Sequence, residues 1–314
     1  MTKGKLNVVF MGSPEFAVPS LHALAQAPDI DILSVVTQPD REKGRGRAVC
    51  PTPVRAAAQQ MGLPSMVMTK DGYAESVTQI SRLFADAIVV VAFGLILKQD
   101  LLDMPPAGCI NLHASLLPEY RGVSPIQAAI LAGDDETGCT TIHMDRGIDT
   151  GDILLCERVA ITPEDTAHSL AVRLSQVGGH LIVRTLRGLR QGTIQAVRQD
   201  TTAGSYTKKI HKEHGQIDWT QPCDWIARFI RAMSPWPSAY TFLHKKRLIV
   251  LDAAAVAGDA GKPPPGSILS VSPFIVACGS GAIEIRQVKS EGKTSVTAEA
   301  FTAGTRLREG DALG

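Results

Sequence analysis

Asn111 and His113 are residue types that can take part in catalysis, and their spacing suits a shared site. Two residues apart on an extended segment, their side chains point to the same face. An asparagine amide can donate to a developing oxyanion, and a histidine can donate a hydrogen bond or carry a proton, so the pair suits acyl transfer. An asparagine and a histidine that only satisfy hydrogen bonds in a core would have the same spacing. The dense motif SLLPEYRG at 115–122 favours the catalytic interpretation.

Three aspartates, Asp145, Asp149 and Asp152, lie within eight residues of the stretch MDRGIDTGD. Such a stretch can be a solvated turn. It can also be a metal loop, although the oxygen spacing of an EF-hand is missing. Thirdly, one carboxylate can reach back to His113 and fix the tautomer of its imidazole. The sequence leaves these three interpretations open.

A basic loop occupies residues 40–47, with four cations and two glycines. Its cations are Arg41, Lys43, Arg45 and Arg47. Arginine and lysine on a loop suit phosphate backbones. A solvated surface loop is the alternative.

Apolar runs at 6–11, 30–37, 86–93 and 109–113 predict buried parallel strands, and the spacing at 52–61 predicts a helix. The alternation predicts a doubly wound, mostly parallel, Rossmann-like α/β domain. Ligands of such sheets bind beyond the C-terminal strand ends, which places His113 at the site. No G-x-G-x-x-G motif follows the first strand, so a dinucleotide site is not expected.

Further along, the segments 140–144 and 153–159 predict a hairpin or an extended flap, and 166–189 predicts a long helix. Near the start, Ser13 is expected to cap a helix that begins at Pro14.

The last third of the chain has short apolar runs between glycine, proline and serine residues, which predicts a small OB-like β-barrel. We therefore expect a catalytic domain over 1–190, a linker over 191–206 and a C-terminal domain over 207–314. Up to Ser205 the chain has 18 lysine and arginine residues and 21 aspartate and glutamate residues, which gives a net charge of −3. From Tyr206 on the corresponding numbers are 14 and 10, a net charge of +4, which favours an anionic partner for the C-terminal part.

The composition excludes several classes of protein. Apolar residues make up 44% and charged residues 20%, as in ordinary globular chains. No apolar run approaches the ~20 residues of a membrane span, and the start does not resemble a signal peptide. None of the six cysteines forms a C-x-x-C pair, so neither a zinc knuckle nor a disulfide framework is expected, and a reducing cytoplasm is the simplest location.

Taken together, the motifs resemble those of the folate-dependent formyltransferases, from about residue 6 to residue 308. They are N-x-H with SLLPEYRG, the later GIDTG, TQPD with the basic loop, VVVAFGLIL at 89–97, and the C-terminal IDW and PWP. Within that family the chain is most similar to the members that formylate initiator methionyl-tRNA.

The resemblance implies site residues. By their match to the family motifs, Asn111, His113 and Asp149 would be catalytic, and 10-formyltetrahydrofolate would be the co-substrate, with no metal. The segments implied for folate binding comprise Phe93, Gly94, Leu95, Ile96 and Leu97, then Ser115, Leu116, Leu117 and Pro118.

The same resemblance implies that the C-terminal domain and the basic loop bind tRNA. The residues expected to contact it are Arg41, Lys43, Arg45, Arg47, Lys208 and Lys209. The family pattern also implies a cytoplasmic monomer. It implies formyl transfer to the α-amine of methionyl initiator tRNA, giving N-formylmethionyl-tRNA for translation initiation.

Two other functions fit parts of the pattern. A formyltransferase acting on a ribonucleotide amine or an amino-sugar nucleotide would share N-x-H and the aspartate motif, but it would not need the basic loop. A non-catalytic tRNA-binding module would keep the loop but would need neither Asn111 nor His113.

Overall fold

The computed structural model describes residues 4–43, 48–200, 202–256 and 263–314. The chain divides into two compact units. The N-terminal unit comprises Met1–Pro125, Glu136–Ala160 and Ala171–Thr207, and the C-terminal unit comprises Ile126–Asp135, Ile161–Leu170 and Lys208–Gly314.

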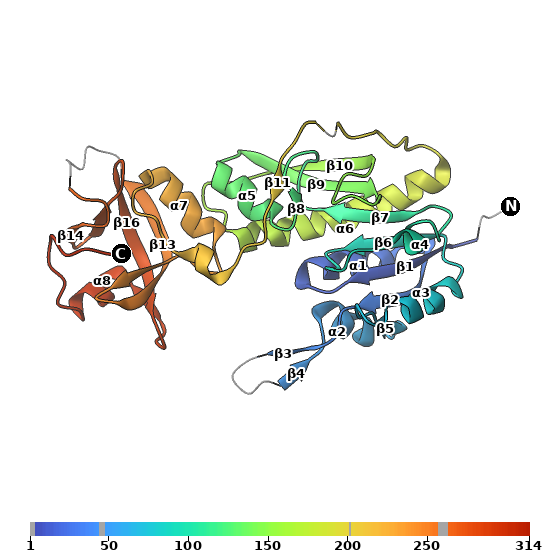
Figure 1. Ribbon diagram of the computed structural model, residues 1–314, viewed down its shortest axis with the longest axis horizontal. Coiled ribbons are helices and arrows are strands. Elements are labelled where there is room, and N and C mark those ends of the chain that lie inside the picture. The colour runs from blue at the N-terminus through green and yellow to red at the C-terminus, as the bar shows by residue number, and fades with distance from the viewer. Residues whose placement is uncertain (1–3, 44–47, 201, 257–262) are drawn as a thin grey trace. The chain divides into compact units, whose positions relative to one another are not determined.

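The N-terminal unit is built on a sheet of seven strands in the order β10-β9-β7-β6-β1-β2-β5 (Figure 1). Five of them are parallel, and β9 and β10 add an antiparallel hairpin at one edge. The strands are β1 (Leu6–Gly12), β2 (Ile30–Thr37), β5 (Ser65–Val67), β6 (Ala87–Val91), β7 (Cys109–His113), β9 (Glu136–His143) and β10 (Ile153–Ala160). This sheet confirms the predicted Rossmann-like fold.

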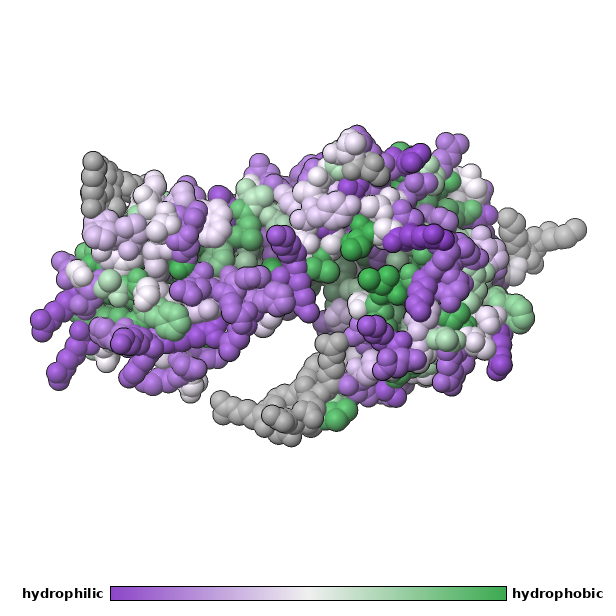
Figure 2. Space-filling view, in the orientation of Figure 1, coloured by the Kyte–Doolittle hydropathy of each residue, from purple (hydrophilic) through white to green (hydrophobic). Residues whose placement is uncertain are grey.

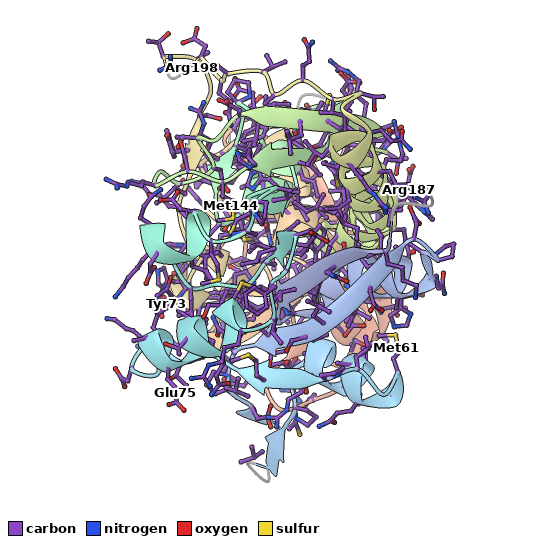
Figure 3. The ribbon with its side chains drawn as sticks, turned by 90° about the vertical axis from the view of Figure 1, so that its right-hand side faces the viewer. Met61, Tyr73, Glu75, Met144, Arg187 and Arg198 are labelled. Atoms are coloured by element: carbon purple, nitrogen blue, oxygen red, sulfur yellow. The ribbon has the colours of Figure 1, made fainter. Side chains whose placement is uncertain are left out.

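Helices cover both faces of this sheet. The helical segments are η1 (Glu15–Ala17), α1 (Val18–Gln26), α2 (Pro53–Gln60), α3 (Tyr73–Ser81), α4 (Gln99–Leu102) and α6 (Ala167–Gln191). In Figure 3, Tyr73 of α3 and Arg187 of α6 mark opposite sides of the sheet. Tyr73 packs into one core cluster with Val9, Ile88 and Cys109, because alternate residues of these strands face the same side.

Gly178 explains how the long helix α6 can carry a glycine pair in its middle. A Cβ at Gly178 would lie 2.5 Å from the side chain of Leu112 on β7. Glycine therefore lets the helix approach the strand that carries Asn111 and His113.

The capping expectation for Ser13 is wrong. The hydroxyl of Ser13 makes no cap, and the residue before η1 is Pro14, which has none to offer. Ser13 Oγ instead accepts a hydrogen bond from the backbone N–H of Gln38, at 3.0 Å. The Ser13 hydroxyl thus links the segments that follow β1 and β2. Satisfying the buried backbone N–H in this loop outweighs capping the start of the helix.

Two small ladders complete the unit. One pairs β3 (Arg41–Lys43) with β4 (Ala48–Cys50), and the other pairs β8 (Arg121–Gly122) with β11 (Tyr206–Thr207). Through β11, part of the predicted linker 191–206 packs on the N-terminal unit. Val197 also bridges Ile153 at the edge of the large sheet. The predicted domain limits themselves stay a prediction.

The C-terminal unit is an antiparallel sheet in the order β12-β13-β16-β15-β14, with β17 also paired to β16. Register shifts in β13 near Asp252 bend that strand, as β-bulges do, and the sheet curls as predicted for an OB-like unit. Its elements are α5 (Pro125–Ala132), η2 (Lys212–Gly215), α7 (Cys223–Ala232), β12 (Tyr240–Leu243), β13 (Lys246–Val256), β14 (Ile268–Val271), β15 (Phe274–Ala277), β16 (Ala282–Ser290), β17 (Ser295–Thr297) and α8 (Ala298–Ala303).

The core of this unit lies between the curled sheet and α7. Ile226 and Phe229 of α7 pack against Val250 and Ile285 of the sheet. The buried indole of Trp219, from the IDW motif, donates to Thr241 Oγ1 at 3.0 Å. Its polar atom is therefore satisfied inside an apolar core.

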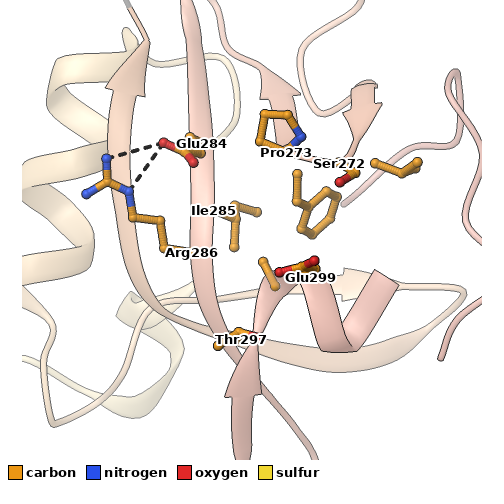
Figure 4. Close-up of a pocket in the computed structure, with 10 residues that line it drawn as sticks. Ser272, Pro273, Glu284, Ile285, Arg286, Thr297 and Glu299 are labelled. Carbon is orange, nitrogen blue, oxygen red and sulfur yellow. Dashed lines mark hydrogen bonds and ion pairs between the residues drawn. The ribbon is translucent and has the colours of Figure 1, made fainter. Parts of the chain in front are cut away.

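A hollow of about 370 Å³ opens on the surface of the C-terminal unit (Figure 4). Among its lining residues are Glu284, Arg286 and Glu299, and Arg286 Nη2 pairs with Glu284 Oε2 at 3.2 Å. Because the one arginine is already paired with a carboxylate, this hollow offers no net positive charge to an anion.

Candidate functional site

Asn111 and His113 lie on β7, which is hydrogen-bonded to β6 on one side and β9 on the other. The two side chains share the sheet face of Cys109, which precedes them and is buried in the core. Asn111 is 9% exposed and His113 is 6% exposed. The strand therefore carries the pair from the edge of the apolar core to the C-terminal end of the sheet, as predicted.

Both ring nitrogens of His113 face acceptors. Nε2 lies 2.9 Å from the carbonyl oxygen of Tyr120, and Nδ1 lies 3.5 Å from Asp149 Oδ2. A carbonyl oxygen can only accept, so Nε2 must carry a proton. Nδ1 is therefore the nitrogen that is left to exchange a proton beside a carboxylate.

Asp149 links Asn111 and His113 of β7 to the motif SLLPEYRG. Its Oδ1 accepts from Asn111 Nδ2 at 3.3 Å, and its Oδ2 accepts from the backbone N–H of Gly122 at 2.8 Å. Asn111, His113 and Asp149 thus converge, as the third interpretation of the aspartate cluster requires.

The other two aspartates of the cluster have structural contacts. Asp145 is exposed and accepts from the N–H of Gly147 and the hydroxyl of Thr150, so it shapes the turn. The backbone carbonyl of Asp152 accepts from the N–H of His143. Among the described parts of the chain, no group of histidine, cysteine, aspartate or glutamate residues could hold a metal ion.

The backbone of the turn is constrained at Asp149 and Gly151. Asp149 has a φ of 54°, in the left-handed region, which costs about 1 kcal/mol or more for a residue with a side chain. A Cβ at Gly151 would lie 1.8 Å from the carbonyl oxygen of His143, so only glycine fits there. The second glycine of GIDTG is therefore required by the shape of this turn.

The first segment predicted to bind folate, Phe93–Leu97, follows β6. Phe93 and Leu97 are buried, whereas Gly94 and Ile96 are exposed. Gln38 Nε2 donates to the carbonyl of Phe93 at 2.8 Å and so fixes the start of the loop. Exposed backbone held in this way is suited to contact a planar ligand.

The second predicted folate segment, 115–118, is more enclosed. Ser115 is fully buried and its hydroxyl donates to the carbonyl of Glu119 at 2.6 Å. The N–H of Leu117 donates to Thr140 Oγ1, which in turn donates to the carbonyl of Ser115. In this structure these contacts hold the turn that delivers Tyr120 to His113.

Three exposed aliphatic side chains lie in or directly after the motifs of the predicted site. Ile96 is 81% exposed, Val123 is 67% exposed and Ile148 is 59% exposed. Figure 2 shows hydrophobic residues among the polar surface of this unit. These segments therefore expose apolar surface.

The structure places the predicted tRNA contacts only in part. Arg41 and Lys43 belong to strand β3, and Arg45 and Arg47 lie outside the described residues. Lys208 and Lys209 are exposed at the start of the C-terminal unit. All six remain predictions.

Sequence reasoning missed two residues at this site, Arg121 and Gln199. Arg121 is fully buried, and its Nε and Nη2 donate to Gln199 Oε1 at 3.1 and 2.8 Å. Gln199 Nε2 donates to the carbonyls of Asp149 and Gly151. The motif SLLPEYRG contained a signal for Arg121, but Gln199 stood in a polar segment without periodicity.

Burial keeps three of the six cysteines, Cys109, Cys139 and Cys278, unreactive. It raises the pKa of the thiols of Cys109, Cys139 and Cys278 to about 12 in each case. Although Cys109 is on the same strand face as Asn111, it therefore acts as a small core residue.

No helix among the described residues is long and apolar enough to cross a membrane.

Comparison with known proteins gives a consistent result. Residues 5–186 match the family model described as formyl transferase, and residues 209–306 match the formyl transferase C-terminal domain. The methionyl-tRNA formyltransferase of Geobacter sulfurreducens is 46% identical over 98% of this chain and 97% of its own length. That of Halothermothrix orenii is 42% identical over 98% of this chain and 100% of its own length.

A solved structure shares the fold. The N-formyltransferase of Helicobacter canadensis, in complex with folinic acid and dTDP-3-aminofucose, has a TM-score of 0.65 and 19% identity. The match covers 90% of this chain and 99% of that one. At that identity the likeness concerns the fold alone.

Proposed function

The chain belongs to the methionyl-tRNA formyltransferase family, and on that basis we propose that it transfers the formyl group of 10-formyltetrahydrofolate to the α-amine of methionyl initiator tRNA. The product is N-formylmethionyl-tRNA, which serves translation initiation. One observation carries the residue-level proposal, namely the convergence of Asn111, His113 and Asp149 at the end of β7.

The reaction passes through a tetrahedral intermediate. The amine nitrogen forms a bond to the formyl carbon, and the formyl C=O becomes an oxyanion. The bond between that carbon and N10 of the folate then breaks and the carbonyl re-forms. Over the whole reaction the amine loses a proton and N10 gains one, so the transfer needs no redox partner.

Asn111 would stabilise the oxyanion. Its amide has two N–H groups, one of which donates to Asp149 Oδ1. The other can donate to the formyl oxygen as charge develops there. One such donor is worth on the order of 3 kcal/mol of transition-state stabilisation.

His113 would move the proton. Tyr120 occupies Nε2, so Nδ1 is the nitrogen that would accept the amine proton and return it to N10. Asp149 Oδ2 lies 3.5 Å from Nδ1 and would stabilise the ring while it is charged.

The wider site remains a proposal at residue level. Phe93–Leu97 and Ser115–Pro118 would bind the folate, supported by the exposed backbone near Gly94 and by the ordered turn at Ser115. Arg41, Lys43, Arg45, Arg47, Lys208 and Lys209 would bind the phosphates of the tRNA, supported by their charge. We expect a monomer acting in the cytoplasm.

A formyl-transfer assay tests the function. Purified protein is supplied with 10-formyltetrahydrofolate and methionyl initiator tRNA, and the formylated aminoacyl-tRNA is measured. We expect turnover by the wild type and by the control His168→Ala, whose side chain is exposed, and a large loss in His113→Ala. Absence of turnover with folate still bound would point to another amine acceptor, such as an amino-sugar nucleotide.

A further inference from the structure

Gln199 is the one buried glutamine whose amide bridges the catalytic turn and a buried arginine among the described residues. It is 5% exposed, and its amide makes four hydrogen bonds. Nε2 donates to the carbonyls of Asp149 and Gly151 at 2.9 and 2.6 Å, and Oε1 accepts from Arg121 Nε and Nη2. Donors and acceptors on the side chain are thus all used.

Arg121 determines which way this amide points. A guanidinium has only donors, so the oxygen of Gln199 must face Arg121 and the nitrogen must face the two carbonyls. Arg121 is itself held by the carbonyls of Asp200 and Ala203, and its guanidinium lies 5.4 Å from the ring centre of Tyr206. The amide is therefore oriented by a group that cannot rotate freely in its buried setting.

The two carbonyls that Gln199 holds belong to the residues on either side of Thr150. Asp149 is in the left-handed region, a conformation that persists only where surrounding contacts impose it. The carboxylate of Asp149 must also keep its contacts with Asn111 and with the N–H of Gly122. Fixing the carbonyl of Asp149 therefore fixes the backbone from which its carboxylate projects.

We propose that Gln199 is a positioning residue for formyl transfer, which acts through Asp149 by holding the turn at 149–151 in its catalytic shape. The inference rests on the proposed function. It assigns a role in the reaction to a residue of the segment 191–206, which the sequence predicted only as a linker.

Two variants test this role. Gln199→Ala removes the bridge. Gln199→Glu keeps the length and the contact with Arg121, but it places a carboxylate oxygen against the carbonyls of Asp149 and Gly151. For each we expect kcat to fall by roughly 10- to 100-fold, with KM for folate and for methionyl-tRNA changed by less than about threefold.

A double-mutant cycle separates positioning from general loss of structure. If Gln199 acts through Asp149, adding Gln199→Ala to Asp149→Asn should lower kcat by no more than about twofold further. The control Thr185→Val removes a buried hydrogen bond between Thr185 and Thr141 in the same unit, and it should leave kcat unchanged. Melting curves are recorded for every variant.

The outcomes are distinct. Wild-type protein that does not formylate methionyl-tRNA would overturn the proposed function. Normal kcat in Gln199→Ala, an equal loss in the presence and absence of Asp149→Asn, or a rise in KM alone would overturn the positioning role while the function stands. Loss of the melting transition in both Gln199 variants would assign the residue to stability and would overturn it too.

Discussion

Asp149 is held by three partners at once: the amide of Asn111, the N–H of Gly122 and, through its carbonyl, Gln199. Two of these partners donate to its carboxylate. An asparagine of the same shape would have to present an amide N–H to one of those donors. The residue is thus specified as a carboxylate and not only by its size.

Asp149→Asn should therefore lower kcat for formyl transfer by about 10²- to 10³-fold, the scale of general acid–base catalysis, because His113 would lose the carboxylate that stabilises its charged ring. The protein should stay folded, because the side chain is not in the apolar core, but the melting temperature should fall because one N–H donor loses its acceptor. Steady-state kinetics and a melting curve on the same preparation check both. Turnover within twofold of wild type would contradict the assignment of Asp149.

The buried thiols give the molecule a defined response to alkaline pH. The unfolded chain loses thiol protons near pH 9, whereas burial raises the pKa of Cys139 to about 12 in the folded state. Above pH 9 the unfolded state binds fewer protons, so the free energy of unfolding falls as pH rises towards 12. Each such thiol contributes up to about 1.4 kcal/mol per pH unit.

Urea unfolding at pH 8 and pH 10 measures this contribution. The wild type should lose stability over that interval, and Cys139→Ala should lose less of it because one titrating group is gone. The exposed Cys156 should be alkylated by iodoacetamide before Cys109 or Cys139, as peptide mass spectrometry would show. Equal pH dependence in the two proteins would contradict the role given to the thiol of Cys139.

Among the elements, the turn between β9 and β10 depends on close packing at Gly151 as well as on its hydrogen bonds. Gly151→Ala would place a Cβ against the carbonyl of His143, and the backbone must move to relieve it. We expect a fall in kcat of at least about tenfold, since small misplacements of catalytic groups are costly. Gly304→Ala is the control, because its Cβ would meet nothing closer than 3.5 Å.

The elements also show which strands and site residues can be predicted from the sequence. Strands β1, β2, β6 and β7 were predictable because strands buried on both faces are mostly apolar. Asn111 and His113 were predictable from their spacing on β7. The contribution of Asp149 was left open, because its contact with His113 spans 36 residues and depends on the fold of the turn. The contacts of Gln199 span up to 78 residues and leave no periodic pattern.

For the whole molecule, the split in charge gives a further prediction. The part from Tyr206 on is basic by +4, and it includes the exposed Lys208 and Lys209. If these two lysines meet tRNA phosphates, replacing both by alanine should weaken tRNA binding. It should also reduce the slope of log Kd against log salt by about 1 to 2, as counterion release requires.

Filter binding of methionyl initiator tRNA at several salt concentrations checks the slope. The double variant Lys5→Ala, Lys70→Ala removes the same charge from exposed positions of the N-terminal unit and should leave the slope unchanged. An equal effect in both double variants would mean that net charge alone matters, and it would contradict a specific contact at Lys208 and Lys209.

The stretch 199–207 has a consequence for where this protein can be shortened. The last helix of the N-terminal unit ends at Gln191, so Gln191 is an obvious place to end a truncated protein. A fragment ending at Gln191 would lack Gln199 and also Ser205, whose carbonyl accepts from the N–H of Arg121. A fragment that keeps the contacts of the catalytic turn must therefore extend through Thr207, and protease cleavage between Gln191 and Gln199 should lower kcat.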